Sequence, residues 1–414
     1  MCSQTFHLSS TSRLRSRAGP LAPDLDGFAD WLATAGYVPS SVKLKLGTVS
    51  HLGAWLVPEA LGAEALDEQR MDAFLQTLRP RREFRRGEST TVRQLLDYLR
   101  EVGRIPAAAP EPDCDGPIDR IARTYERFLV HERGLSRATV INYLPITRAF
   151  LAERFGTRPV ALERLTARDA NQFVLGQAKR LSRTRSKLVA TALRSFLRHL
   201  HQRGDLGADL AGAIPPVTNW RLSGLPKSLS PEKVESVLAS CDRSTATGRR
   251  DHAILLLLAR LGLRGGEVAA LTLDDFDWAK ALVTLSGKGQ RREALPLPED
   301  VGRAVAAYLR DGRPPCATRR VFVRAIAPYR GFCSTMAVCD IVRRALARAG
   351  IDAPLKGAHV LRHSLACGML RNGASLEEIG RILRHRHPET TQIYAKLDLE
   401  ALRTLAPAWP GGAS

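Results

Sequence analysis

The chain has 414 residues, which is too long for one ordinary hydrophobic core, so two or three domains are expected. Its 44% hydrophobic and 25% charged residues exclude a disordered chain, and its longest apolar run, residues 253–259, is too short to span a membrane. The 62 Lys and Arg against 42 Asp and Glu give a formal charge of +20, which favours a polyanionic partner such as nucleic acid. The alternative is a basic protein whose arginines are simply solvated.

Two proline-rich stretches, at 105–117 and 213–233, predict linkers. In the second, Ser230 and Pro231 form a typical N-cap and first position of a helix. We therefore predict an N-terminal tail, two helical modules, a C-terminal domain and a C-terminal tail. Their limits are 1–25, 26–104, 118–212, 225–404 and 405–414.

The two helical modules resemble each other. Leu66 and Phe74 of the first match Leu165 and Phe173 of the second at an offset of 99 residues, so internal duplication is the simplest interpretation.

A basic cluster precedes the last helix of each module. It is either a solvated face or a surface that contacts DNA phosphates. The candidate DNA contacts are Arg81, Arg82, Arg85, Arg86, Lys179, Arg180, Arg183, Arg185 and Lys187.

The C-terminal domain has a mixed pattern. Residues 252–271 predict a buried helix, a glycine break and a second helix, and residues 281–297 predict a hairpin with a Gly-Lys-Gly turn. A short strand is expected at 321–323, and helices are expected from Ser334 onward. Ser375 and Glu378 form a capping box for a helix that ends near residue 384.

Six polar residues of this domain suit phosphoryl transfer. Arginines can clamp a phosphodiester with forked donors, and they supply the positive charge that would otherwise require a metal. Lysine and histidine can exchange protons with a leaving oxygen, and a tyrosine hydroxyl can attack phosphorus. The six are Arg264, Lys288, His359, Arg362, His385 and Tyr394.

The motifs around these residues resemble those of the tyrosine recombinases, also called the phage integrase family. They read "LGLRGGEVAAL", "SGKGQRREALPL", "HVLRHSLA" and "LRHRHPETTQIY", and Tyr394 comes nine residues after His385. The resemblance covers about 225–400 strongly and 118–212 more weakly. It implies a mainly α protein with a small antiparallel sheet in the C-terminal domain, in which helical SAM-like core-binding modules precede a tyrosine-recombinase catalytic domain.

On the phosphate, the resemblance implies that Arg264 and Arg362 grip the scissile group and that His385 donates a hydrogen bond to it. Glu267 would orient Arg264, although a solvated helix residue is the alternative.

For the bond exchange, the resemblance implies that Lys288 protonates the leaving 5′ oxygen and that His359 assists as acid or base. Tyr394 would be the nucleophile and would form a 3′-phosphotyrosyl bond. A solvated turn lysine and a packed aromatic are the plain alternatives for Lys288 and Tyr394.

The implied function is site-specific DNA recombination, for integration, excision or transposition of a mobile element, without ATP, metal or cofactor. The implied partners are a double-stranded DNA recombination site and three further copies of the chain, as a homo-tetramer on two DNA sites. Sister recombinases or an accessory DNA-bending protein are further possible partners. We expect no membrane association, and the seven scattered cysteines favour a cytoplasmic location.

Two other functions stay open. Residues 373–394 also look like a helix-turn-helix, which suggests a non-catalytic DNA-binding protein. A topoisomerase-like strand transferase would use the same chemistry as a recombinase.

One position departs from the family pattern. The family has glycine before the second histidine, whereas this chain has Arg384, which fits only if its backbone avoids positive φ. Arg384 and Arg386 are alternative DNA contacts. His385 and His387 are poorly spaced for zinc, and His363 is expected only to pack or cap.

Overall fold

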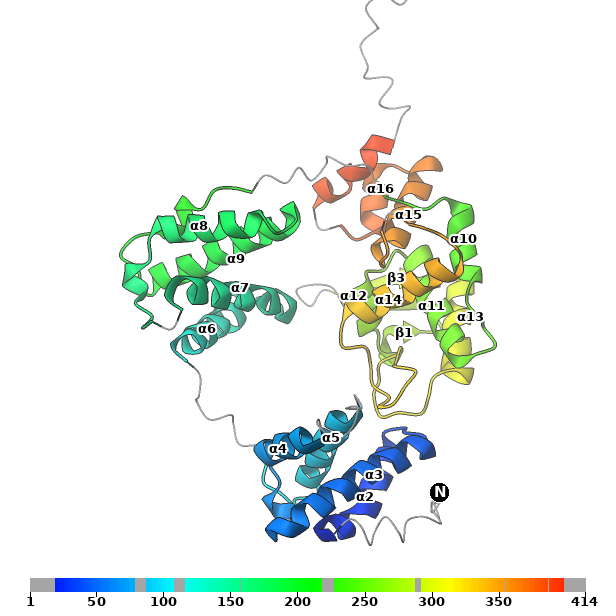
Figure 1. Ribbon diagram of the computed structural model, residues 1–414. Coiled ribbons are helices and arrows are strands. Elements are labelled where there is room, and N and C mark those ends of the chain that lie inside the picture. Colours follow the sequence, from blue (N-terminus) through cyan, green and yellow to red (C-terminus); the bar gives the residue numbers. More distant parts are fainter. Residues whose placement is uncertain are drawn as a thin grey trace, which may run out of the picture. The chain divides into compact units, whose positions relative to one another are not determined.

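The computed structural model describes residues 19–78, 87–107, 116–156, 158–217, 227–286, 292–353, 355–385 and 387–397. These residues are mostly helical, with one three-stranded antiparallel sheet in the C-terminal part (Figure 1), which confirms the predicted fold class. Contacts between Cα atoms divide the chain into two compact units, residues 1–107 with 224–414 and residues 108–223. Within the described residues, no helix is long and apolar enough to cross a membrane.

The N-terminal helices share one hydrophobic core, which includes Phe28, Leu46 and Phe74. Gly36 lies between the first two α-helices at φ +90°, a conformation that favours glycine. The elements are η1 (Gly19–Asp24), α2 (Leu25–Thr34), α3 (Pro39–Leu56), η2 (Val57–Glu59), η3 (Ala63–Ala65), α4 (Glu68–Leu78) and α5 (Gly87–Glu101).

The unit of residues 108–223 has its own core, built around Tyr125, Phe150 and Phe196. Its order of a long helix, a 3-10 turn and two further helices repeats that of α3, η3, α4 and α5, and Gly134 at φ +55° takes the place of Gly36. The elements are α6 (Pro117–Arg127), η4 (Phe128–Glu132), α7 (Arg137–Phe155), η5 (Leu162–Arg164), α8 (Ala167–Ala178), α9 (Arg183–Gln202) and η6 (Leu210–Ala213). The domain limits given above stay a prediction.

The C-terminal part begins as predicted, since the Ser230 side chain caps the helix that Pro231 starts. Its first elements are α10 (Pro231–Ala239), α11 (Ala246–Arg260), α12 (Gly265–Ala270), η7 (Leu273–Asp275), β1 (Phe276–Asp277), β2 (Leu282–Ser286) and β3 (Arg292–Pro296). Then come α13 (Glu299–Asp311), α14 (Thr335–Arg348), α15 (His359–Arg371), α16 (Leu376–Ile382), η8 (Pro388–Thr390) and η9 (Gln392–Leu397).

The predicted hairpin is confirmed, because β2 and β3 pair antiparallel with Leu282 opposite Pro296. The strand expected at 321–323 is wrong. These residues are fully buried but make only isolated bridges, Val323 to Gly331 and the neighbouring Arg320 to Thr272, and the third strand is β1. A run of three apolar residues indicates that the segment is buried, but it does not distinguish a strand from an irregular segment.

The break between α11 and α12 depends on a glycine. Residues 253–259 of α11 are all buried, and Gly262 then turns the chain at φ +58°. A Cβ atom at Gly262 would lie 2.7 Å from the side chain of Leu383, so a larger residue would clash. The turn therefore brings the start of α12 close to the end of α16.

The helix-turn-helix interpretation of 373–394 is wrong. Ser375 and Glu378 form the predicted capping box, but in the part of the chain that is described α16 is followed only by the short 3-10 helices η8 and η9. A recognition motif needs a second α-helix that can lie in a groove of DNA.

Candidate active site

Arg264 is held in place by Glu267. Arg264 lies just before α12, and its backbone N–H and Nη1 donate to Glu267 Oε2 and Oε1 at 2.8 and 2.7 Å. Burial opposes the charge of Glu267, but the backbone bond from Arg264 and the charge of Arg384 outweigh it and lower the pKa of this carboxyl. Glu267 is therefore an ionised carboxylate that fixes the guanidinium, as the resemblance implies.

Arg362 joins three parts of the chain. It is 5% exposed on α15, and its two terminal nitrogens donate to the carbonyl oxygens of Gly262 and Leu383. Burial, together with the charges of Arg264 and Arg384, lowers the pKa of Arg362 to about 10, so the side chain stays protonated at neutral pH. Since guanidinium has five N–H donors, three remain for a phosphate.

Arg384 contradicts the expectation that arginine would avoid positive φ here, because its φ is +54°. The physical reason lies in its side chain, which is 7% exposed and forms an ion pair with Glu267 at 2.8 Å. Its carbonyl oxygen accepts a 3.1 Å hydrogen bond from Arg264 Nη2. The ion pair therefore compensates for a backbone conformation that usually requires glycine.

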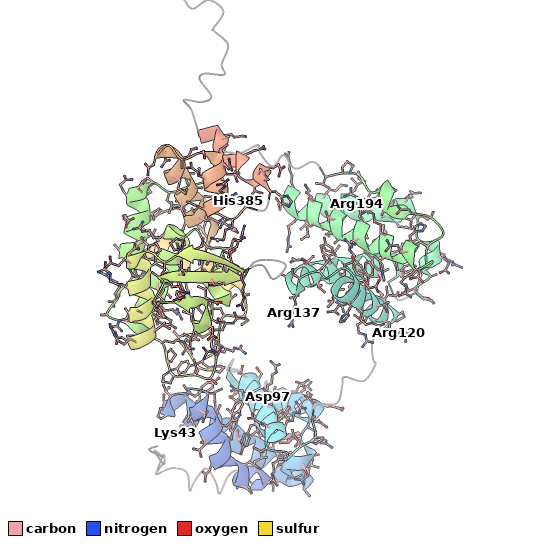
Figure 2. The ribbon with its side chains drawn as sticks, turned by 180° about the vertical axis from the view of Figure 1, so that it is seen from behind. Lys43, Asp97, Arg120, Arg137, Arg194 and His385 are labelled. Atoms are coloured by element: carbon pink, nitrogen blue, oxygen red, sulfur yellow. The ribbon has the colours of Figure 1, made fainter. Side chains whose placement is uncertain are left out.

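His385 follows directly and is half-buried, in the turn after α16 (Figure 2). Its Nδ1 lies 2.7 Å from Thr391 Oγ1. Burial and the positive charges of Arg362 and Arg264 lower the pKa of His385 to about 4, so the ring is neutral at pH 7. If Thr391 donates to Nδ1, the proton sits on Nε2, which then becomes a hydrogen-bond donor.

Tyr394 lies in η9 and is only 1% exposed. Its hydroxyl is 2.7 Å from His363 Nδ1, one helical turn after His359 on α15. Burial raises the pKa of Tyr394 to about 12. His363, expected only to pack or cap, therefore contacts the reactive atom of the candidate nucleophile.

His359 lies at the exposed start of α15, and its ring centroid is 6.3 Å from that of His363. Partial burial and the charges of Arg362 and Arg264 lower its pKa. Both rings lie on the same helical face, because residues four apart on a helix are neighbours.

The structure thus brings five of the six predicted catalytic residues into one connected set, together with Glu267. Lys288 lies outside the described residues, as do Arg81, Arg82, Arg85, Arg86 and Arg386. Within the described chain, no three histidine, cysteine or acidic side chains gather as a metal site requires.

The family model described as "Phage integrase family" matches residues 227–400 of this chain. A Sinorhizobium fredii protein named integrase/recombinase y4rA is 44% identical over 401 residues, which cover 96% of this chain and 97% of that protein. The chain belongs to the phage integrase family.

A further relative is the tyrosine recombinase XerD of Listeria monocytogenes, 32% identical over 274 residues, or 64% of this chain and 90% of that one. Two solved structures share the fold. XerH bound to a palindromic difH substrate has a TM-score of 0.55 at 19% identity and covers 76% of this chain and 88% of its own. A lambda integrase dimer bound to a COC′ core site has a TM-score of 0.51 at 17% identity, with coverage of 67% and 94%. The chain is therefore a site-specific DNA recombinase of the tyrosine type.

The described DNA-contact candidates of this recombinase are all exposed. They lie at the end of α8 and the start of α9, where Arg185 Nη1 also donates to Asn142 Oδ1 at 3.4 Å. They are Lys179, Arg180, Arg183, Arg185 and Lys187. Their exposure leaves them free to meet phosphates, and their role stays a prediction.

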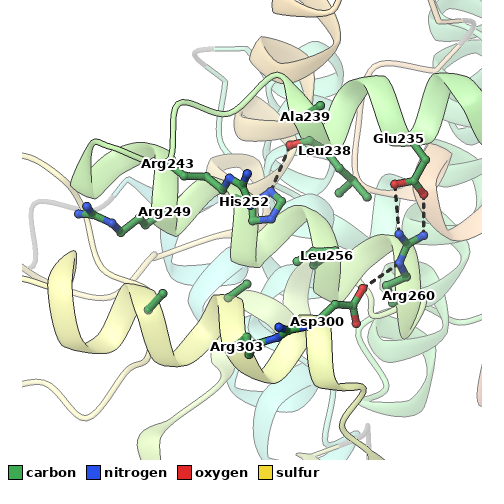
Figure 3. Close-up of a pocket in the computed structure, with 12 residues that line it drawn as sticks. Glu235, Leu238, Ala239, Arg243, Arg249, His252, Leu256, Arg260, Asp300 and Arg303 are labelled. Atoms are coloured by element: carbon green, nitrogen blue, oxygen red, sulfur yellow. Dashed lines mark hydrogen bonds and ion pairs between the residues drawn. The ribbon is translucent and has the colours of Figure 1, made fainter.

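A separate groove of about 780 Å³ lies between α10, α11 and α13 (Figure 3). None of the five described candidate catalytic residues lines it. Arg260 forms ion pairs there with Glu235 and Asp300, and His252 Nδ1 contacts the Leu238 carbonyl oxygen at 3.1 Å. Arg260 thus pairs with two carboxylates here, whereas in the candidate active site Arg264 and Arg384 share the carboxylate of Glu267.

Three residues of the site were missed or misjudged in the sequence. His363 directly follows the arginine of the H-x-x-R motif, and its place four residues after His359 was the available signal. Thr391 has no such signal in the sequence, because its contact with His385 depends on the path of the chain through η8 and η9. Arg384 was noticed as a departure from the pattern, but its partner Glu267 lies 117 residues away in the chain.

Proposed function

We propose that this recombinase cuts each DNA strand by attack of the Tyr394 hydroxyl on the scissile phosphorus. A 3′-phosphotyrosyl bond forms and the 5′ oxygen leaves. The observation that supports the proposal is that Arg362 donates to the backbone of both the Gly262 turn and the Leu383 turn, while Tyr394 contacts His363, the residue after Arg362 on α15. The phosphotyrosyl bond conserves the energy of the broken phosphodiester, so rejoining needs no ATP.

The charge of each residue determines its proposed role in the reaction. Arg264 and Arg362 would hold the phosphate oxygens and stabilise the charge that develops in the transition state. His385, neutral and oriented by Thr391, would donate a further hydrogen bond from Nε2. Lys288 would protonate the leaving 5′ oxygen, and His359 would assist at the phosphate.

The partner is double-stranded DNA, in which the recombinase recognises a specific site. We propose that four copies assemble on two such sites and exchange strands in two steps, for integration, excision or transposition of a mobile element. The XerH and lambda integrase structures named above contain DNA sites, which supports the choice of partner. The net charge of +20 predicts a steep fall of affinity with salt.

Covalent capture tests this function. DNA from the ends of the element that encodes the protein is nicked close to the presumed cleavage point, so that the cut strand cannot be religated. It is then mixed with the wild type or with Tyr394→Phe. A denaturing gel should show a protein–DNA adduct for the wild type alone. Clear binding in a parallel gel shift without any adduct would favour a non-catalytic DNA-binding protein.

A second assay separates recombination from a topoisomerase-like activity. Two labelled duplexes that carry the site are incubated with the protein, and supercoiled plasmid is incubated in parallel. Exchange of labelled strands between duplexes supports a recombinase. Relaxation of the plasmid without any exchange would support the strand-transferase alternative.

A further inference from the structure

We propose that His363 is the base that accepts the hydroxyl proton of Tyr394 when this side chain attacks the scissile phosphorus. The inference rests on the proposed function, because it assigns one proton transfer within that reaction. It starts from the 2.7 Å contact between His363 Nδ1 and Tyr394 Oη, which is within the range in which a base can take a proton.

The resting protonation states suit this role. Charged and titratable groups around His363 are His359 and Arg362 on α15, His385 in the turn after α16, and Tyr394 in η9. Burial, followed by the charges of His359 and Arg362, lowers the pKa of His363, so its ring is neutral at pH 7. A neutral ring whose Nδ1 is unprotonated accepts the hydrogen bond that the Tyr394 hydroxyl donates.

Tyr394 requires such a base. A phenol with a pKa of about 12 is ionised to only roughly 10⁻⁵ at pH 7. The hydroxyl is buried with 1% of the residue exposed, so bulk water is a poor acceptor for its proton. Among the described residues, the side chain that contacts this hydroxyl with a basic atom is His363. His359, one turn earlier, is then left to act at the phosphate.

The proton and the bonds balance through the cycle. In cleavage, the bond from Tyr394 Oη to phosphorus forms, the bond from phosphorus to the 5′ oxygen breaks, and the phenolic proton passes to His363 Nδ1. The 5′ oxygen leaves with a proton from the proposed acid, Lys288. In rejoining, a 5′ hydroxyl gives its proton back to Lys288 and attacks phosphorus, the bond from phosphorus to Tyr394 Oη breaks, and the His363 imidazolium returns its proton to Tyr394. No co-reactant is consumed.

Two substitutions separate a base from a mere positioning residue. Asparagine at 363 has an oxygen that accepts the Tyr394 hydrogen bond, but it cannot take the proton. Alanine has neither property. General base catalysis contributes about 10²–10⁴-fold. We therefore expect both His363→Asn and His363→Ala to lower the single-turnover rate of adduct formation on the nicked duplex at least ~100-fold.

His252→Asn is the matched control. His252 is also half-buried and also makes an Nδ1 hydrogen bond, but it lines the groove of Figure 3, whose lining does not include Tyr394. The His252→Asn variant should therefore cleave DNA at the wild-type rate. Thermal melting and gel shifts should show that all the variants fold and bind the duplex. If the alanine variant unfolds, the asparagine variant, which keeps the hydrogen bond, carries the test.

A modified duplex shows on which side of phosphorus His363 acts. Sulfur in place of the bridging 5′ oxygen is a good leaving group without protonation, so it should restore cleavage by Lys288→Ala. It should not restore cleavage by His363→Asn. The wild-type rate should also rise with pH below the ordinary histidine pKa as His363 loses its proton, and this dependence should be weaker in the asparagine variant, in which His359 still titrates.

The outcomes are distinct. If wild type forms the adduct and His363→Asn cleaves within a few-fold of it, His363 only positions Tyr394 and the inference is wrong, while the proposed function stands. Rescue of His363→Asn by the sulfur duplex would place His363 on the leaving-group side and also overturn it. If the wild type forms no adduct on a duplex that it binds, the proposed function fails and this inference fails with it.

Discussion

The two halves of the candidate active site are held together by different forces. The arginine half consists of Arg264, Arg362 and Arg384, which are fixed by Glu267 and by backbone carbonyl oxygens. The tyrosine half consists of Tyr394, His363, His385 and Thr391, which are joined by two side-chain hydrogen bonds of 2.7 Å. The first half is charged, and the second is neutral at pH 7.

This difference follows from the arginines themselves. Their positive charge, added to the effect of burial, disfavours protonation of His385 and His363, so these rings stay neutral. The charged half can therefore hold an anion, while the neutral half can donate hydrogen bonds and receive protons. A site that separates these tasks can act on a phosphodiester without the arginines having to lose a proton.

The largest effect is expected at the nucleophile. Tyr394→Phe removes only the hydroxyl, so the core that packs around this ring should survive. Adduct formation should fall by at least about 10⁴-fold, as for other nucleophiles removed from enzymes. DNA affinity should be unchanged within a few-fold in a gel shift. Residual cleavage near the wild-type rate would place the nucleophile elsewhere.

Arg362→Lys tests the charged half. Lysine keeps the charge, but its single nitrogen cannot bond to the carbonyls of Gly262 and Leu383 and still reach a phosphate. We expect the cleavage rate to fall by about 10²–10³-fold, the range seen when one donor to a developing charge is removed. Cleavage that stays within ten-fold of wild type would show that charge alone, without the fork, is sufficient.

At Arg384, the cost of backbone strain can be compared with the stabilisation from the ion pair to Glu267. Arg384→Gly should relieve about 1–2 kcal/mol of backbone strain at positive φ but lose a buried ion pair, whose rupture costs roughly 3–5 kcal/mol. Because Arg264 still pairs with Glu267, the net loss of unfolding free energy should be about 1–3 kcal/mol.

Arg384→Ala is the matched control for this position. It loses the same ion pair and keeps the strain, so it should be less stable than Arg384→Gly by about 1 kcal/mol in urea unfolding. An alanine variant as stable as the glycine variant would mean that the backbone at 384 stores no strain.

The smallest effect is expected from Thr391→Val. Valine matches the shape of threonine but removes the hydroxyl that orients His385. The loss of one hydrogen bond, about 1 kcal/mol, corresponds to a fall of roughly five-fold in the cleavage rate. Timed adduct assays should resolve this change. The control is Thr390→Val, at the preceding residue, which lies in η8. A rate equal to the control would mean that Thr391 does not set the ring orientation.

Much of the site was predictable because its motifs are local. The glycine break before α12, the hairpin β2–β3 and the capping box of α16 each depend on residues close together in the chain, and the structure confirms them. The candidate catalytic residues were proposed from their spacing within such segments.

The rest depends on contacts between distant segments. Glu267 was expected to orient Arg264, but its second partner Arg384 is 117 residues further on. The positive φ at Arg384 was excluded by a local steric rule, and that rule failed because an ion pair compensates for the strain. His363 likewise looked like a packing residue, because only the folded chain brings η9 against α15.

The most direct test of the account is the chemical location of the DNA in the trapped adduct. Trypsin digestion of the wild-type adduct, followed by nuclease treatment and mass spectrometry, would identify the modified peptide. Attack by Tyr394 predicts nucleotide mass on residues 387–396, "HPETTQIYAK", with the phosphate on the one tyrosine of this peptide, Tyr394. A nucleotide on any other residue would contradict the central claim that the neutral half of the site supplies the nucleophile.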